Sequence, residues 1–186
     1  MFFLRKSTHE PLPVAMSGVR MGERALQIGI DDPAVAGALA ARVGLSGHAA
    51  MALTDESGAA KARAVAAKVG ALVDVQVAPL HALPFDDNAF DVIVVHGLSG
   101  LISSLDGSAR IAALRECARV LRPGGRIVIV EWGPRAGLGS LVRPQRTDKA
   151  YDDSGGAARA LAAAGFRASR VLAEREGYRF SEGMKG

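Results

Sequence analysis

The chain has 186 residues and a mass of 19.3 kDa, a size that suits one domain. Hydrophobic residues make up 49% and charged residues 23%, which excludes a disordered chain, and we see no apolar run long enough to span a membrane. The net charge of +4 comes with only 5% aromatic residues, and this composition argues against a nucleic-acid partner. Cys117 is the only cysteine, so no internal disulfide is possible and we expect a cytoplasmic protein.

The first 22 residues differ from the rest of the chain. They contain Pro11 and Pro13 and have no sustained hydrophobic period, and we interpret them as an N-terminal arm with a short helix or turn. From residue 23 to residue 186 the pattern is regular, and we expect one domain there.

Strands and helices then alternate along the chain. Apolar runs between turn residues predict strands, while Asp32–Pro33 and Ser57, each before an alanine-rich segment, predict helix starts. In chain order we expect a strand at 25–28, a helix at 33–43, a strand at 49–53, a helix at 57–69, strands at 73–77 and 90–95, a helix from 106 or 108 to 121, a strand at 126–131, a basic loop to about 156, a helix at 157–164, and strands at 168–174 and 179–183.

This alternation predicts an α/β fold of the doubly wound, Rossmann-like type. Right-handed crossovers give a mostly parallel sheet with helices on both faces, and the last two strands add an antiparallel hairpin to make seven strands. The apolar run Val92–Val95 is typical of a central strand. Ligands of such sheets bind beyond the carboxyl ends of the strands, so the residues that follow the first four strands are candidates for a site.

Two segments give the sequence a resemblance to a known family. Leu83–Val94 carries Leu-Pro-Phe-Asp-Asp-Asn before the fourth strand, and Glu116–Arg126 carries Arg-Pro-Gly-Gly before the fifth. From about Gly22 to the C-terminus, the chain resembles the class I S-adenosylmethionine-dependent methyltransferases of type 11, most of all the quinone-biosynthesis C-methyltransferases. The resemblance implies a Rossmann-like fold, S-adenosylmethionine as cofactor, and methyl transfer to a small or lipid-like acceptor.

The resemblance also implies where the cofactor would bind. Gly29 matches the first glycine of the family's motif, while Asp31 and Pro33 stand where the second and third glycines are usual, and Gln27 replaces an acid. Asp55 matches the acid that holds the ribose hydroxyls. From the residues alone, Gly29 fits a simple strand-to-helix turn equally well, and Asp55 fits a helix cap equally well.

The positions expected around the adenine depart further from the family. Glu56 stands where an apolar residue is usual, and Pro79, followed by Leu80 and His81, stands where an acid is usual. The cofactor site predicted from the resemblance therefore consists of Gly29, Asp31, Asp55, Glu56, Leu80 and His81.

The catalytic prediction rests on histidine. His96 follows the fourth strand at the edge of the sheet where ligands bind, and it is the first candidate for a catalytic base, with His81 second. We find no metal-ligand spacing, and the first turn lacks the fingerprint of a nicotinamide dehydrogenase.

The altered cofactor motif also favours a second hypothesis, a non-catalytic methyltransferase-like protein that acts through partner binding or self-association. The candidates for an uncovered apolar contact surface are residues 2–4 together with Leu138, Leu141 and Val142.

Overall fold

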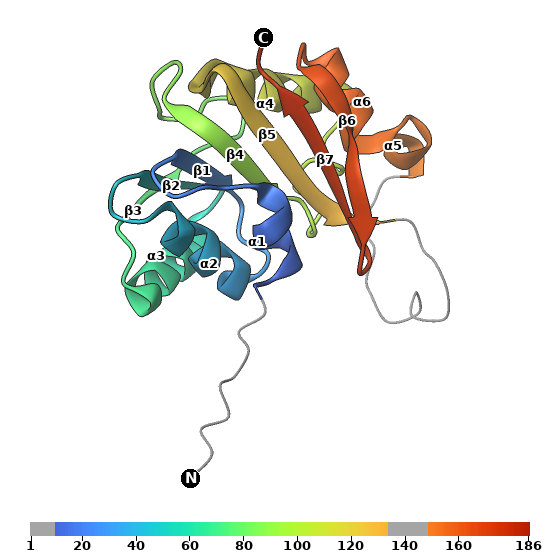
Figure 1. Ribbon diagram of the computed structural model, residues 1–186. Helices are drawn as coiled ribbons and strands as arrows, with labels where there is room; N and C mark the ends of the chain where they lie inside the picture. The colour runs from blue at the N-terminus through green and yellow to red at the C-terminus, as the bar shows by residue number, and fades with distance from the viewer. Residues whose placement is uncertain (1–9, 134–148) are drawn as a thin grey trace.

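One seven-stranded sheet runs through the computed structural model, which describes residues 10–133 and 149–186 (Figure 1). The strands lie in the order β3-β2-β1-β4-β5-β7-β6. They are β1 (Arg24–Ile28), β2 (His48–Leu53), β3 (Val73–Val77), β4 (Phe90–His96), β5 (Leu121–Trp132), β6 (Arg167–Arg175) and β7 (Tyr178–Met184). Strands β1 to β5 pair in parallel, and β7 runs antiparallel to both β5 and β6. The predicted fold class is therefore confirmed.

Six helices cover the two faces of the sheet in the described parts of the chain (Figure 1). They are α1 (Leu12–Ser17), α2 (Pro33–Val43), α3 (Glu56–Val69), α4 (Gly107–Val120), α5 (Lys149–Asp153) and α6 (Gly156–Ala163). Apolar residues of α1, α2 and α3 form the core on one face, and those of α4, α5 and α6 form it on the other. None of these helices is long and apolar enough to cross a membrane.

Strand β4 lies at the centre of the sheet, between β1 and β5. Its residues Val92–Val95 are at most 1% exposed, because helices cover both faces, and this confirms the prediction of a central strand. Cys117 lies on the buried face of α4, as its place in a helix predicted, and burial raises the pKa of its thiol to about 12.

Aspartate side chains start three of the helices. Asp32 caps α2 as predicted, and Asp55 and Asp106 cap α3 and α4 by accepting a backbone N–H three residues on, each at 2.8 Å. Helix α3 therefore begins one residue before the predicted Ser57. At α4, the hydroxyl of Ser108 donates to the capping aspartate, so Asp106 and not Ser108 is the cap.

Two further predictions of secondary structure need correction. Strand β5 begins at Leu121, because Leu121 pairs with Phe90. The Pro-Gly-Gly segment forms an irregularity inside the strand, and the positive φ of Gly124, +72°, permits this irregularity. Helix α5 lies within the segment predicted as loop, and the burial of Tyr151 favours helix there despite weak local signals. The apolar candidates for self-association, at 2–4, 138, 141 and 142, lie outside the described residues.

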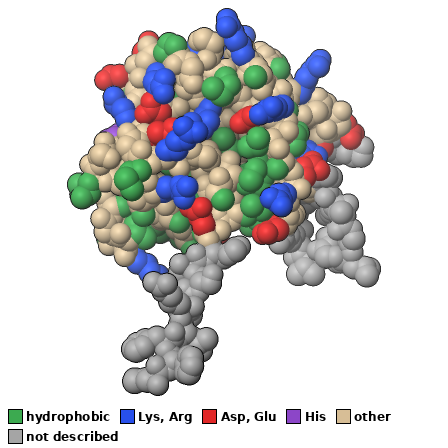
Figure 2. All heavy atoms as spheres, viewed as in Figure 1, with side chains coloured by type: hydrophobic (Ala, Val, Ile, Leu, Met, Phe, Trp, Pro, Cys, Tyr) green, Lys and Arg blue, Asp and Glu red, His purple; other side chains and the backbone are tan. Residues whose placement is uncertain are grey.

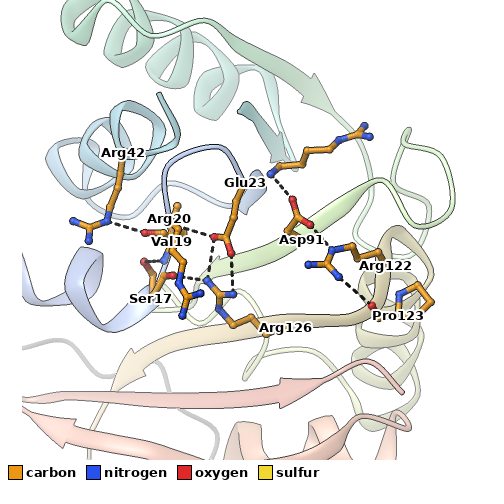
Figure 3. A network of polar contacts seen from close by, with 11 residues as sticks. Ser17, Val19, Arg20, Glu23, Arg42, Asp91, Arg122, Pro123 and Arg126 are labelled. Carbon is orange, nitrogen blue, oxygen red and sulfur yellow. Dashed lines mark hydrogen bonds and ion pairs between the residues drawn. The ribbon is translucent and has the colours of Figure 1, made fainter. Parts of the chain in front are cut away.

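Charged side chains tie the N-terminal segment to the amino ends of the strands (Figure 3). The guanidinium of Arg126 donates two hydrogen bonds of 3.1 Å to the carboxylate of Glu23, and it also donates to the carbonyl of Gly18. Asp91 accepts from the backbone N–H of Arg24 at 2.7 Å and from the guanidinium of Arg122. These contacts hold the start of β1 against the starts of β4 and β5.

Basic and acidic side chains are interspersed on the face of the molecule shown in Figure 2. They do not gather there into one basic stripe of the kind that follows a phosphate backbone. The expectation that the chain has no nucleic-acid partner stays a prediction for the molecule as a whole.

Candidate functional site

A cleft of about 590 Å³ opens at the carboxyl ends of β2, β3 and β4. The loops after these strands and the start of α4 form its walls, which consist of Thr54, Pro79, Leu80, His81, Ser99, Gly100, Leu101, Ser104, Leu105, Ala109 and Ala113. The strand order reverses between β1 and β4, and ligands of parallel α/β sheets bind at such a switch point. The cleft is of the size that proteins use for small ligands and cofactors.

Three of the predicted site residues lie in or beside this cleft. Leu80 and His81 line it, and Asp55 follows the lining residue Thr54. The side chain of Asp55 is exposed, and its carboxylate accepts the backbone N–H of Gly58 at 2.8 Å. Asp55 therefore caps α3, as the alternative interpretation expected, and it is next in sequence to the lining residue Thr54.

Glu56 has a different environment from Asp55. Its side chain is 71% exposed and forms an ion pair with Arg63 farther along α3. An exposed pair of this kind contributes little to stability, so the contact leaves Glu56 free to change partners.

The backbone of Gly29 is held in a conformation that favours glycine. Its φ is +80°, and a Cβ added there would lie 2.9 Å from Leu101 Cδ2 and 3.2 Å from the carbonyl oxygen of His96. Both the backbone angle and the lack of space require a glycine at this position. Leu101 also lines the cleft, so its side chain contacts both Gly29 and the open space.

Asp31 joins the loop after β1 to the loop after β4. Its carboxylate accepts the backbone N–H of Leu98 at 2.6 Å and that of Ser99 at 3.2 Å. The aspartate that replaces the motif's second glycine is therefore satisfied within the chain, and it fixes the position of the loop that forms one wall of the cleft.

His96 lies under the other face of the sheet. Its side chain is buried, and its ring contributes, with Asp32, to a cavity of about 10 Å³ rather than to the cleft. The Nε2 atom of His96 lies 3.2 Å from Gln27 Oε1, and Gln27 Nε2 donates to the carbonyl of Ala36 at 3.1 Å. Burial lowers the pKa of His96, although the charges of Asp31 and Asp32 oppose this shift. The ring is therefore neutral at pH 7, and its Nε2–H donates to the Oε1 atom of Gln27.

The proposed role of His96 as a base therefore stays a prediction, and the structure does not bring it together with the cleft residues. Gln27, which replaces the family's acid, is a neutral partner for a neutral imidazole. The contact between these two residues spans 69 positions, so it had no local signal in the sequence.

Sequence reasoning missed a second buried polar group, at the end of β5. Glu131 is 4% exposed and accepts the hydroxyl of Tyr151 at 2.9 Å. Burial raises the pKa of Glu131 to about 7, although Tyr151 opposes the shift. The guanidinium of Arg110 lies 4.4 Å from the centre of the Tyr151 ring and donates to the carbonyls of Ile102 and Ser103, both at 3.1 Å. A charged residue that ends an otherwise apolar strand was the available signal.

Comparisons with known proteins agree with this geometry. The methyltransferase domain family matches residues 26–129. The ubiquinone/menaquinone biosynthesis C-methyltransferase UbiE of Teredinibacter turnerae is 34% identical over 143 residues, which cover 75% of this chain and 52% of that protein. The crystal structure of a SAM dependent methyltransferase from Aquifex aeolicus superposes with a TM-score of 0.72 at 21% identity, covering 93% of this chain and 87% of that one.

The structure of PigF with SAH is also similar, with a TM-score of 0.62, 19% identity, and coverage of 88% of this chain and 51% of that one. The likeness to solved structures shows the fold, and with the family match it supports S-adenosylmethionine as the cofactor. The chain spans about half the length of the curated relatives it matches. Because the family match extends over more than half of its residues, this chain belongs to the methyltransferase domain family, within the class I S-adenosylmethionine-dependent methyltransferases.

Proposed function

We propose that this protein transfers a methyl group from S-adenosylmethionine to a small or lipid-like acceptor at the carboxyl edge of its sheet. The observation that carries the proposal is the cleft of about 590 Å³ near the switch point of the strand order, with Asp55 next in sequence to its lining residue Thr54. Membership of the methyltransferase domain family supports it. The names of the UbiE relatives favour an acceptor of the quinone class.

The residues of the cleft fit the nucleoside half of this cofactor. The carboxylate of Asp55 is exposed beside Thr54 and can accept hydrogen bonds from ribose hydroxyls. Pro79 and Leu80 offer apolar surface to an adenine ring, and His81 adds a polar group at the same wall. We propose that these residues, with Glu56 nearby on α3, hold the nucleoside.

The amino-acid half fits only after a side chain moves. We place that half near Gly29 and Asp31, and Leu101 occupies the space beside Gly29. The contacting atom is the terminal methyl of a leucine in a loop, so we propose that a change of its rotamer opens the space. The carboxylate of Asp31 provides a negative charge that can pair with an ammonium group of the ligand.

The cofactor supplies a methyl group on a positively charged sulfur, which is a strong electrophile. The task of the protein is then to bind and orient the two reactants, with modest help from a base. His96 remains the first candidate for that base from its position after β4, although it lines the small cavity on the other face of the sheet and not the cleft. Because its Nε2–H donates to Gln27, Nδ1 is the nitrogen that can accept a proton. His81 lines the cleft and is the second candidate.

One observation favours the alternative of a non-catalytic, partner-binding protein: Leu101 fills the place beside Gly29. Self-association also stays a prediction. In the described parts of the chain, Leu45 and Leu72 are 96% and 88% exposed and lie on one groove at the amino edge of the sheet. Sedimentation at micromolar concentration tests it: a dimer is the expected result, and a monomer throughout would contradict it. For the compartment we propose the cytoplasm, because the one cysteine is buried and free.

Calorimetry with S-adenosylmethionine and with its demethylated product, S-adenosylhomocysteine, tests the proposed function. We expect both to bind the wild type, and we expect Asp55→Ser to weaken both by about ten-fold or more, because a charged acceptor is lost. Serine retains the helix cap, so the stability should change little. Asp74→Ser, a change of the same kind near the amino end of β3, where the carboxylate accepts a hydrogen bond from Gln76, should leave binding unchanged. Absence of binding to the wild type would contradict cofactor use in the resting conformation and favour the alternative.

A further inference from the structure

Leu101 ends the cleft on the side of β1. Its side chain belongs to the wall of the cleft, and its Cδ2 atom fills the space beside the Cα of Gly29. Gly29 itself does not line the cleft, and Leu101 is the lining residue that packs on it.

Contacts on both sides hold Leu101 in this position. Before it in the chain, Asp31 binds the backbone N–H groups of Leu98 and Ser99. After it, the guanidinium of Arg110 donates to the carbonyls of Ile102 and Ser103. The placement of Leu101 beside Gly29 is therefore a consequence of anchors in the loop after β1 and in α4.

This arrangement affects the two ends of a ligand differently. Asp55 follows β2 and Gly29 follows β1, and these strands are neighbours in the sheet. A nucleoside anchored by Asp55 can occupy the cleft while Leu101 stays in place. A ligand whose tail continues toward β1 must take the space that the leucine methyl fills.

We propose that Leu101 is a specificity-determining residue, a gate that sets the affinity for the amino-acid half of the ligand and leaves the affinity for the nucleoside half unchanged. The proposal rests on the proposed function, since it assigns the ligand of the same cleft. When the gate is closed in most molecules, the apparent affinity is the affinity of the open form multiplied by the fraction of molecules in which the gate is open. The gate therefore discriminates between full-length cofactor and nucleoside fragments.

Titration calorimetry with two probes tests the gate. S-adenosylhomocysteine carries the amino-acid half, and 5′-methylthioadenosine lacks it. We expect Leu101→Ala to tighten the binding of S-adenosylhomocysteine by roughly ten-fold. This is the effect expected if the closed state of the wild type is about ten times more populated than the open state and the variant removes the closed state. The binding of 5′-methylthioadenosine should change less than two-fold. Leu105→Ala, which alters another lining leucine, should not produce this difference between the probes.

Leu101→Met keeps an apolar side chain of similar volume but is more flexible, so it should tighten the first probe less than alanine does. Thermal unfolding confirms that each variant is folded. Unchanged or weaker binding of S-adenosylhomocysteine to folded Leu101→Ala, while the wild type binds it, would overturn the gate and leave the proposed function standing. Equal tightening of both probes would also overturn it. If neither the wild type nor Leu101→Ala binds either probe, the proposed function fails together with the gate.

Discussion

At the amino ends of the strands, Glu23 and Asp91 pair with arginines, whereas at the carboxyl ends of β1 and β2, Asp31 and Asp55 accept neutral backbone N–H groups. At the amino edge, Glu23 pairs with Arg126, and Asp91 pairs with Arg122 (Figure 3). At the carboxyl edge, Asp31 accepts two backbone N–H groups. The pairs at the amino edge join opposite charges and fasten strands, while Asp31 is held in place by two backbone N–H groups.

Asp55 follows the same rule as Asp31, since its carboxylate also accepts a backbone N–H. Two fixed negative charges near one cleft attract a cationic ligand, and S-adenosylmethionine carries both a sulfonium and an ammonium group. We therefore propose that the two edges differ in function: the amino edge stabilises the fold, and the carboxyl edge binds the ligand. Variants at Glu131, Arg126 and Gly29 test this difference.

The largest expected effect is on the pH dependence of stability, through Glu131. Burial raises the pKa of Glu131 from 4.5 to about 7. Because the folded state binds the proton more tightly, the free energy of unfolding should fall by about 3 kcal/mol as the pH rises from 4.5 to 7 and above, at 1.36 kcal/mol per pKa unit. Glu131→Gln should lose this contribution, since glutamine does not titrate.

Urea unfolding of the wild type and Glu131→Gln between pH 4.5 and pH 8 measures the difference. The variant should gain stability relative to the wild type as the pH rises, while Tyr151→Phe should lose stability at high pH because the carboxylate loses its donor. Parallel pH curves for the wild type and Glu131→Gln would show that Glu131 does not titrate in this range.

The next effect concerns the amino edge. Arg126→Met should destabilise the fold by about 2 kcal/mol, because the side chain of Arg126 is only 20% exposed and its guanidinium donates both to the carboxylate of Glu23 and to the carbonyl of Gly18. Arg170→Met is the matched control; that arginine is 66% exposed in its pair with Glu182, so its loss should cost less than about 1 kcal/mol. Neither change should alter the affinity for S-adenosylhomocysteine, and a loss of affinity in Arg126→Met would break the separation of the two edges.

The smallest effect on stability, but a large one on binding, is expected for Gly29→Ala. We expect a cost of about 1–2 kcal/mol, from a positive φ and from crowding against Leu101 and the His96 carbonyl. Gly70→Ala provides a control with similar strain, since Gly70 has φ +66° and open space around an added Cβ. The binding of S-adenosylhomocysteine should weaken in Gly29→Ala and stay unchanged in Gly70→Ala. Equal affinities in both variants would remove Gly29 from the site.

Local sequence patterns predicted most of the fold. The run Val92–Val95 and the pair Asp32–Pro33 determine a strand and a helix start through interactions between near neighbours, so they are readable from the chain. Helix α5 escaped prediction because its formation depends on the burial of Tyr151 against distant residues.

The candidate site was less accessible to sequence reasoning. Asp31 contacts residues 67 and 68 positions away, so its role in fixing a loop could not be seen in the motif that contains it. Leu101 belongs to no motif, and its position beside Gly29 depends on where the loop after β4 folds back. The resemblance located the cleft edge, but contacts across the sheet decide which residues face it.

The most direct test of the account is a titration of the ¹⁵N-labelled protein with S-adenosylhomocysteine, followed by the backbone amide resonances. The central claim is that the cofactor binds at the carboxyl edge and leaves the amino edge unchanged. We expect shifts at Gly29, Asp55, Leu80 and Leu101 and unchanged resonances at the starts of β1, β4 and β5. Shifts centred on the amino edge, or no shifts at saturating ligand, would contradict the account.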